Sequence, residues 1–249
     1  MLFRGFVVSF RKDYVPSDPE HLHMGEIIEN PRLHNRKYIF SDRHDAGKQL
    51  GALFRTFPSL HEPVVLAIPA GGVPIGREVA VALGASLSLA IVRKILIPGN
   101  TEAGFGAVTW DGQVLINEQL RSALGLSADE VDSAIAQTRK NVLERIARFT
   151  GGRGFPLLTG KPVILTDDGL ASGFTMLAAA KSVDLHQPSR IIVAVPTASA
   201  SSAELVSRYV DQLVCLNIRT SRQFAVADAY ERWYDLDDYE VLEELASLP

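Results

Sequence analysis

The chain has 249 residues, enough for one large domain or two small ones with a sizeable core. Charged residues make up only 22% and the formal net charge is −4, so composition gives no electrostatic reason to expect nucleic acid or an anionic membrane as a partner. No segment is apolar for long enough to cross a bilayer, no cleavable leader is evident, and the single cysteine, Cys215, excludes an intrachain disulfide, so we expect a cytoplasmic protein.

The first 36 residues show no sustained periodicity, and we expect them to form an N-terminal arm or extension. Met24 is a candidate for the start of translation, and the sequence does not decide between it and Met1. The three histidines of this segment, His21, His23 and His34, lack the spacing of metal ligands, so we interpret them as surface residues.

A helix and a strand with a glycine-rich end are predicted next. Apolar residues recur at helical spacing from Ser41, the expected N-cap, up to Pro58. The apolar run Val64–Ile68 predicts a strand, and Pro69-Ala70-Gly71-Gly72-Val73-Pro74 leads from it into a second helix. Two glycines at such a point let backbone amides approach an anion closely, although a simple strand-to-helix turn is the alternative.

A cationic pair follows the next predicted strand. The run Leu87–Val92 places Arg93 and Lys94 at the carboxyl end of that strand, and the glycine-rich residues 95–109 follow. These features suit an anionic ligand and a mobile lid, and a solvated cationic pair is the alternative.

Two further local signals follow before the centre of the chain. Asp111-Gly112 predicts the tight turn of a hairpin over residues 107–116. Ser127 and Glu130 then predict a capping box for a long helix that ends before Gly151.

The most informative stretch is 162–175, Pro-Val-Ile-Leu-Thr-Asp-Asp-Gly-Leu-Ala-Ser-Gly-Phe-Thr. Its β-branched start predicts a buried strand that places Asp167 and Asp168 at a carboxyl end. Small and hydroxylated residues then lead into an alanine-rich helix, which is the composition of an anion cradle at a helix N-terminus. Two carboxylates would repel a bare phosphate, so the ligand should also carry hydroxyl groups or a divalent cation.

The remaining elements complete an α/β pattern. Strands are predicted at Arg190–Val195 and Leu213–Leu216, with a helix between them. We therefore predict a doubly wound, mostly parallel sheet with flanking helices over residues 37–218, with the three candidate loops at its carboxyl edge. The acidic, aromatic residues 219–249 form either a small hood that includes Phe224 and Tyr230, or a segment whose aromatic side chains pack on the sheet.

The stretch with Asp167-Asp168-Gly169 closely resembles the phosphoribosyl pyrophosphate (PRPP) signature of type I phosphoribosyltransferases, and residues 40–245 resemble that family more loosely. The resemblance implies that the two acids hold the ribose hydroxyls and also serve catalysis. It implies that the 5-phosphate is wrapped by the residues after the acids: Gly169, Ala171, Ser172, Gly173, Phe174 and Thr175.

The same resemblance assigns the leaving group. It implies that pyrophosphate meets the amides of Ala70, Gly71 and Gly72 together with the catalytic cations Arg93 and Lys94. Mg²⁺ is the implied cofactor; PRPP carries it, and Asp167 and Asp168 are its candidate protein ligands. The loop resembles the subgroup with a Pro-x-Gly-Gly-Val-Pro sequence, but Ala70 stands where an arginine is expected.

The resemblance implies transfer of ribose 5-phosphate from PRPP to an unidentified small-molecule acceptor, a nucleobase or related nitrogen compound, with release of pyrophosphate. One alternative is a PRPP- or nucleotide-sensing regulator without turnover, which the alanine favours. The other is a receiver-like phospho-acceptor domain that uses Asp167 or Asp168, although such a domain does not require the cradle. A homodimer is compatible with the sequence, which identifies neither the acceptor nor the acid that assists proton transfer.

Overall fold

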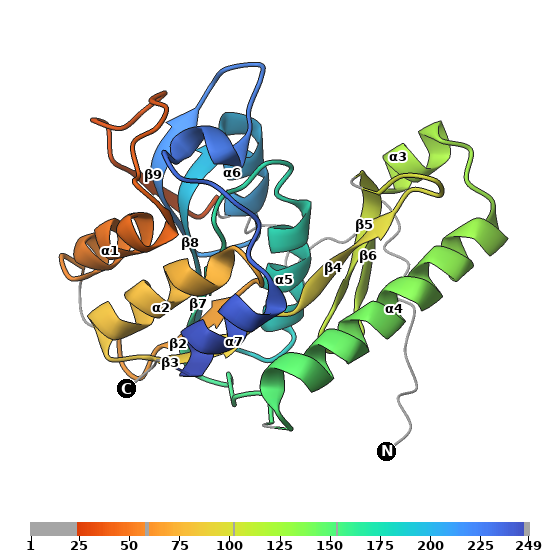
Figure 1. The fold of residues 1–249 in the computed structure, drawn as a ribbon, viewed down its shortest axis with the longest axis horizontal. Helices are drawn as coiled ribbons and strands as arrows, with labels where there is room; N and C mark the ends of the chain where they lie inside the picture. The colour runs from red at the N-terminus through yellow and green to blue at the C-terminus, as the bar shows by residue number, and fades with distance from the viewer. Residues whose placement is uncertain (1–23, 58–59, 102, 153, 247–249) are drawn as a thin grey trace. The chain divides into compact units, whose positions relative to one another are not determined.

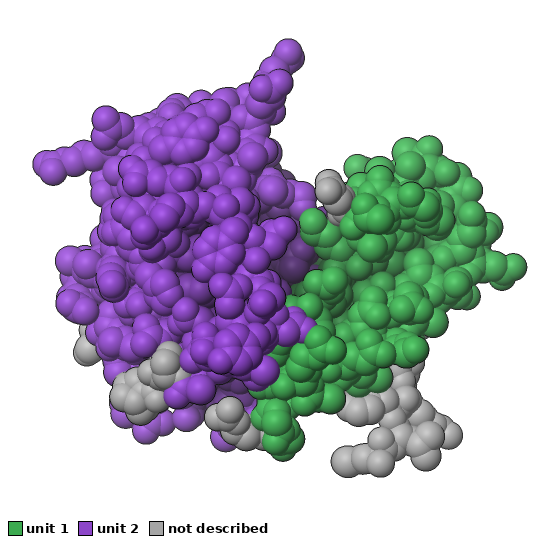
Figure 2. All heavy atoms as spheres, viewed as in Figure 1, with its two compact units in different colours: residues 1–22, 91–153 green, residues 23–90, 154–249 purple. Residues whose placement is uncertain are grey.

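The computed structural model describes residues 24–57, 60–101, 103–152 and 154–246. The chain forms two compact units, which Figure 2 distinguishes by colour. Of the described residues, those in 24–90 and 154–246 form the larger unit and those in 91–152 the smaller unit. The smaller unit is therefore largely an insertion into the chain of the larger one. No helix in the described ranges is both long and apolar enough to cross a membrane.

The larger unit is built on a six-stranded sheet with the order β1-β9-β8-β7-β2-β3, in which every neighbouring pair is parallel (Figure 1). Its strands are β1 (Glu26–Glu29), β2 (Val64–Ala67), β3 (Ser86–Leu89), β7 (Pro162–Thr166), β8 (Arg190–Ser199) and β9 (Gln212–Arg219). Its helices are α1 (Arg43–Phe54), α2 (Gly72–Leu83), α5 (Phe174–Asp184), α6 (Ala200–Ser207) and α7 (Asp238–Ala246), with a 3₁₀ turn, η1 (Val226–Ala229).

Helices cover both faces of this sheet. The buried side chains of α1 and α2 form one cluster with Val65, Ile164, Ile192 and Val214, which share one sheet face. No residue of α5 or α6 belongs to that cluster, yet α5 contacts β7 and α6 contacts β9, so these helices lie on the opposite face. Every residue of β7 is buried, as expected for a central strand covered on both sides. The predicted doubly wound α/β fold is confirmed.

The smaller unit is a three-stranded antiparallel sheet with a long helix. Its elements are β4 (Val92–Leu96), β5 (Gly104–Thr109), β6 (Val114–Ile116), α3 (Glu118–Ala123) and α4 (Ala128–Thr150). The hairpin turn at Gly112, with φ 86°, and the capping box of Ser127 and Glu130 are both confirmed. The helix contacts β4 and β5 through its apolar stripe.

The prediction of one strand over Leu87–Val92 is wrong, because that apolar run is divided between strands of two different sheets. β3 ends at Leu89, where its partner β2 also ends, and Val92 begins β4 in the smaller unit. Arg93 and Lys94 therefore lie inside an antiparallel strand and not at the carboxyl end of a parallel one.

The expected lid over residues 95–109 is largely regular structure. Ile95 and Phe105 are fully buried and belong to the paired strands β4 and β5. These apolar side chains anchor the glycine-rich segment, so among its described residues only 97–101 and 103 lie outside the two strands.

The expected N-terminal arm also differs in part. Glu26–Glu29 form the edge strand β1, paired in parallel with β9. Residues 1–23, with His21 and His23, lie outside the described residues, whereas His34 contacts the carboxylate of Glu29 at 2.6 Å. This strand could not be recognised from periodicity, because an edge strand of four residues is too short to show one.

The first helix is capped by Asp42 and not by Ser41. The Asp42 carboxylate accepts the N–H of Asp45 at 2.9 Å, and the Asp45 carboxylate in turn accepts the N–H of Ser41 at 3.0 Å. Serine and aspartate are both favoured at the N-cap, so the sequence alone does not distinguish Ser41 from Asp42 as the cap.

The C-terminal helix α7 is tied to α1 and α2 by an imidazole. His44 Nδ1 lies 3.0 Å from Glu78 Oε1, and its Nε2 lies 2.8 Å from Glu244 Oε1. The hydrogen bond to Glu244 is the main cause that raises the pKa of His44 above its ordinary value of 6.5, while burial opposes the shift. Protonated His44 therefore stabilises the docking of α7.

We predict that this stabilisation depends on pH. Because the folded-state pKa is raised, the contribution is fully present below 6.5 and is lost as pH rises through the raised value. His44→Gln should lower the free energy of unfolding by about 0.5 kcal/mol at low pH, a small effect because the side chain is partly exposed, and by less at high pH. Urea denaturation at about pH 6 and about pH 9 measures the difference, with the exposed His61→Gln as control. A difference that does not change with pH would contradict the assignment.

Candidate functional site

Two loops start side by side at the carboxyl edge of the parallel sheet. β2 and β7 are neighbours in register, with Ala67 opposite Thr166, so the segments that leave them begin together. The N–H of Ile68 donates to Thr166 O at 2.9 Å, and Thr166 Oγ1 donates to Gly72 O at 3.2 Å. The sheet thereby brings the turn at 69–72 against the two acids that follow Thr166, as the sequence predicted.

The two glycines of the turn are required by the acids behind them. A Cβ at Gly71 would lie 1.8 Å from Asp168 Oδ2, and a Cβ at Gly72 would lie 2.5 Å from Thr166 O and 3.0 Å from the Cα of Asp167. No side chain fits in either place without displacing the second loop. The pair is therefore more than a flexible strand-to-helix turn, because it allows the backbone to pass directly over the carboxyl groups.

The arginine at the start of α1 holds one of the acids. Arg43 Nε and Nη2 donate to Asp168 Oδ2 at 3.0 and 2.9 Å, and Nη1 donates to Tyr234 O at 2.8 Å. Its guanidinium lies 3.9 Å from the centroid of the Trp233 ring. The residue is only 6% exposed, and it also lines a pocket of about 330 Å³ beside the C-terminal segment. Sequence reasoning missed Arg43, since a cation at the start of a helix carries no local sign of a distant carboxylate.

The two acids are electrostatically coupled. Burial, and then the charge of Asp168, raise the pKa of Asp167 well above its ordinary value. Burial also raises the pKa of Asp168, and Arg43 opposes that rise. Asp167 Oδ1 accepts the N–H of Asp168 at 2.9 Å, and Arg43 occupies Asp168 Oδ2. No N–H of the described residues donates to the second oxygen of either carboxyl, and the two side chains lie close enough to share a hydrogen bond when one of them is protonated.

These two oxygens suit a ligand with hydroxyl groups or a hard divalent cation, because carboxylate oxygens are the ligands that Mg²⁺ prefers. The described residues contain no group of three or more side chains that would hold a metal by themselves. A metal here would thus depend on a ligand for most of its coordination, as the sequence-based hypothesis of Mg²⁺ carried by PRPP requires.

The loop after the acids is anchored at its start and open at its end. The Leu170 N–H donates to Thr197 O at 2.9 Å, and Ser202 Oγ donates to Leu170 O at 2.7 Å. A Cβ on Gly169 would lie 2.7 Å from Val226. These contacts fix the first half of the loop against β8, α6 and η1.

The second half of the loop is built for an anion. Ala171 and Ser172 are exposed, and Gly173 is the N-cap of α5, with φ 73° and no side-chain cap. The amides of the first turn, which includes Thr175, have no acceptor within the helix, and the helix dipole adds partial positive charge there. Phe174 is the first residue of the helix, and its N–H makes a long contact of 3.4 Å with Ser172 Oγ.

The expected hood residues have different surroundings. Tyr230 is 1% exposed, donates its hydroxyl to Asp168 O at 2.6 Å, and packs on Trp233 with 5.1 Å between ring centroids. It is therefore a core aromatic that supports an acid, and the interpretation as an acceptor-facing hood residue is wrong. Phe224 is partly buried, with the guanidinium of Arg219 5.4 Å from its ring centroid.

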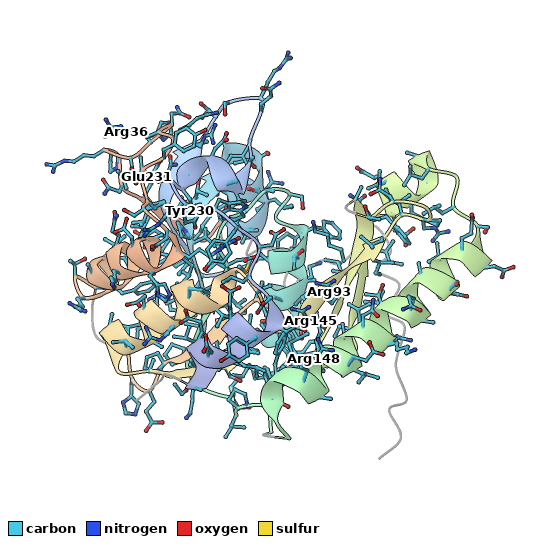
Figure 3. The ribbon with its side chains drawn as sticks, in the orientation of Figure 1. Arg36, Arg93, Arg145, Arg148, Tyr230 and Glu231 are labelled. Carbon is cyan, nitrogen blue, oxygen red and sulfur yellow. The ribbon has the colours of Figure 1, made fainter. Side chains whose placement is uncertain are left out.

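The cationic pair belongs to the other unit. Both Arg93 and Lys94 are exposed on β4, and Figure 3 labels Arg93 on that strand. The structure thus brings together residues 70–72 and 167–175 within the larger unit, and places the two cations on the smaller one.

Comparison with known proteins agrees with this architecture. The sequence model of the family described as "Phosphoribosyl transferase domain" matches residues 48–231. Two proteins of Mycobacterium tuberculosis with provisional phosphoribosyl transferase names, MT0597 (strain CDC 1551 / Oshkosh) and Rv0571c (strain ATCC 25618 / H37Rv), are each 35% identical over 207 residues. That match covers 82% of this chain but 46% of each relative, so the chain spans less than half of their length.

A solved structure shows the same fold. The crystal structure of TT1426 from Thermus thermophilus superimposes with a TM-score of 0.70 at 33% sequence identity, covering 84% of this chain and 98% of that one. The family match gives no support to the receiver-like alternative. With its parallel sheet, its acid pair before an open helix N-terminus and a family match over residues 48–231, the chain belongs to the phosphoribosyl transferase domain family.

Proposed function

We propose that the larger unit binds PRPP, and that the protein transfers its ribose 5-phosphate to a small-molecule nitrogen nucleophile with release of pyrophosphate. One observation carries the proposal. Two carboxyl oxygens that receive no N–H from the described residues lie beside a glycine turn, and the loop after them leads into a helix N-terminus, so hydroxyl-binding and anion-binding groups follow one another. Membership of the family supports the reaction class and leaves the acceptor open.

Each part of the site has a role in holding the substrate. Asp167 and Asp168 accept hydrogen bonds from the ribose hydroxyls through their second oxygens. The amides at 171–175 and the Thr175 hydroxyl hold the 5-phosphate at the start of α5. The amides of Ala70 and Gly71 face the pyrophosphate group. The N–H of Gly72, the third residue of the expected set, already donates to Ile68 O at 3.0 Å.

The reaction breaks the bond between the anomeric carbon and the pyrophosphate oxygen, which keeps the electron pair. The acceptor nitrogen uses its lone pair to form the new bond to that carbon and then loses its proton, with one of the two acids as the nearby base. An oxocarbenium-like transition state is favoured when charge on the leaving group is neutralised and the two partners are aligned. Mg²⁺ carried by PRPP would supply part of that neutralisation.

The smaller unit supplies the remaining proposed parts. As the family resemblance implies, Arg93 and Lys94 add positive charge for the pyrophosphate, and the glycine-rich segment after them supplies a lid that excludes water. Both cations are exposed, so they are accessible to an anionic ligand. This assignment rests on the family resemblance and on exposure.

A second candidate function is a PRPP-binding regulator without turnover. Ala70 is the observation that favours it, because the turn offers pyrophosphate only backbone amides where related loops add a cationic side chain. A pyrophosphate-release assay with PRPP, Mg²⁺ and a panel of nucleobases separates the two functions. Release with at least one base indicates a transferase, and PRPP binding without release by any base indicates the regulator.

The site assignment predicts weaker PRPP binding in two variants. Asp168→Asn removes a charged acceptor and Thr175→Ala removes a donor, so each should weaken binding of Mg²⁺–PRPP by roughly 1.5–3 kcal/mol. Isothermal titration calorimetry at low salt measures the change. Asp132→Asn, on the exposed face of α4, is the matched control and should bind as the native protein does. Unchanged affinity in the Asp168→Asn, Thr175→Ala double variant would contradict the proposed site.

The departure at Ala70 predicts a gain of affinity. Ala70→Arg should tighten inorganic pyrophosphate by about 1–3 kcal/mol, because a guanidinium adds charge-assisted hydrogen bonds to the amides already present. Binding of ribose 5-phosphate should not change, since that ligand contacts the loop at 167–175. Ala70→Gln is the neutral control of similar length. If Ala70→Arg leaves pyrophosphate affinity unchanged, or weakens both ligands equally, the turn at 69–72 is not the pyrophosphate loop.

A further inference from the structure

Arg43 occupies a position that the local structure of its helix does not explain. It is the first residue of α1, where the helix dipole disfavours a cation, and it is only 6% exposed. Burial of a guanidinium is unfavourable unless its donors are satisfied. The reason for its place must therefore lie in the groups that it contacts.

Those groups are Asp168 and the C-terminal segment. Two of its nitrogens share a single oxygen, Asp168 Oδ2, at 3.0 and 2.9 Å, while the third reaches Tyr234 O at 2.8 Å. One face of the guanidinium is covered by Trp233, 3.9 Å from its ring centroid. The contact is thus one-sided, and no N–H of the described residues donates to Asp168 Oδ1.

The backbone of Asp168 is also held by a hydrogen bond. Tyr230 donates its hydroxyl to Asp168 O at 2.6 Å, and its ring packs on Trp233. Asp168 is consequently fixed at its carbonyl oxygen and at one carboxyl oxygen. Both supports depend on residues 230–234, far from the loop in sequence.

We infer that Arg43 is a positioning residue for the proposed transfer: it fixes the orientation of the Asp168 carboxyl through Oδ2, so that Oδ1 is presented to a ribose hydroxyl. The inference rests on the proposed function, because it assigns Asp168 to the ribose. Arg43 does not itself contact the substrate, and Trp233 and Tyr234 keep its guanidinium oriented.

A double-mutant cycle tests this role. The cycle compares the native protein, Arg43→Gln, Asp168→Asn and the double variant for calorimetric binding of Mg²⁺–PRPP and of inorganic pyrophosphate. Arg43→Gln should weaken PRPP about tenfold or more in the native background and less than about twofold in the Asp168→Asn background, because the residue acts through that acid. Pyrophosphate alone should bind as before, a readout that general loss of structure would not preserve.

Two further variants keep the test decisive. Arg43→Lys retains the charge without the fork and should restore part of the PRPP affinity, which gives a second measurement if Arg43→Gln does not fold. Arg55→Gln removes an exposed arginine at the other end of α1, and it should bind PRPP as the native protein does. Circular dichroism confirms that each variant is folded.

The outcomes separate this inference from the proposed function. If Asp168→Asn weakens PRPP binding while Arg43→Gln and Arg43→Lys bind as the native protein does, the inference fails and the proposed function stands. If the losses from Arg43→Gln and Asp168→Asn add in the double variant, Arg43 does not act through Asp168, and the inference also fails. If the native protein binds neither PRPP nor ribose 5-phosphate, both the proposed function and the inference fail.

Discussion

The candidate site depends on the close packing of two loops where β2 and β7 end. Gly71 and Gly72 pass so near to Asp167 and Asp168 that any side chain at either glycine would collide with the second loop. Because the two strands are paired in register, the loops start at the same level, and neither can move without the other. An amide-lined turn and an acid pair are thereby held in one arrangement before any ligand binds, which lowers the entropic cost of binding.

The charges of the two acids are balanced by a neighbouring side chain, and the overall composition of the chain does not indicate this balance. Two adjacent carboxyl groups, partly withdrawn from water, have raised pKa values, chiefly because burial disfavours their charged forms. One buried guanidinium compensates Asp168 and lies against an aromatic ring. The C-terminal segment supplies that ring, so it contributes to the site by supporting the acids rather than through the aromatic hood that the sequence suggested.

The features that could be predicted from sequence are those with a local cause. The buried strand before Asp167, the hairpin turn at Gly112 and the capping box of Ser127 each follow from a few adjacent residues, and the structure contains all three. The contact of Arg43 with Asp168 joins residues 125 positions apart, and no local pattern indicates it. The burial of Tyr230 likewise follows from tertiary packing, because an aromatic residue in an acidic segment is equally compatible with a hood.

The boundary between the two units could not be predicted from the sequence, for a different reason. From Leu87 to Val92 the apolar run is continuous in sequence, yet the chain leaves one sheet at Leu89 and enters another at Val92. Periodicity reports that a segment is buried and extended, and it does not report which sheet receives the segment. The apolar run therefore indicated correctly that the chain is extended near Arg93 and Lys94. The sheet to which these two residues belong was predicted wrongly.

The strand order of the larger unit has a consequence for synthesis of the chain. Among the described strands, β1 pairs with β9 alone. β2 pairs with β7, which follows the inserted unit in the sequence, so the sheet is assembled from both ends of the sequence. The described strands and helices of the smaller unit, by contrast, are contiguous between Val92 and Thr150 and find their partners locally. A ribosome therefore releases a foldable insertion well before the surrounding sheet has its last strand. The acids and the glycine turn meet only after β7 has emerged, and β1 remains an unpaired edge until Arg219 has been made.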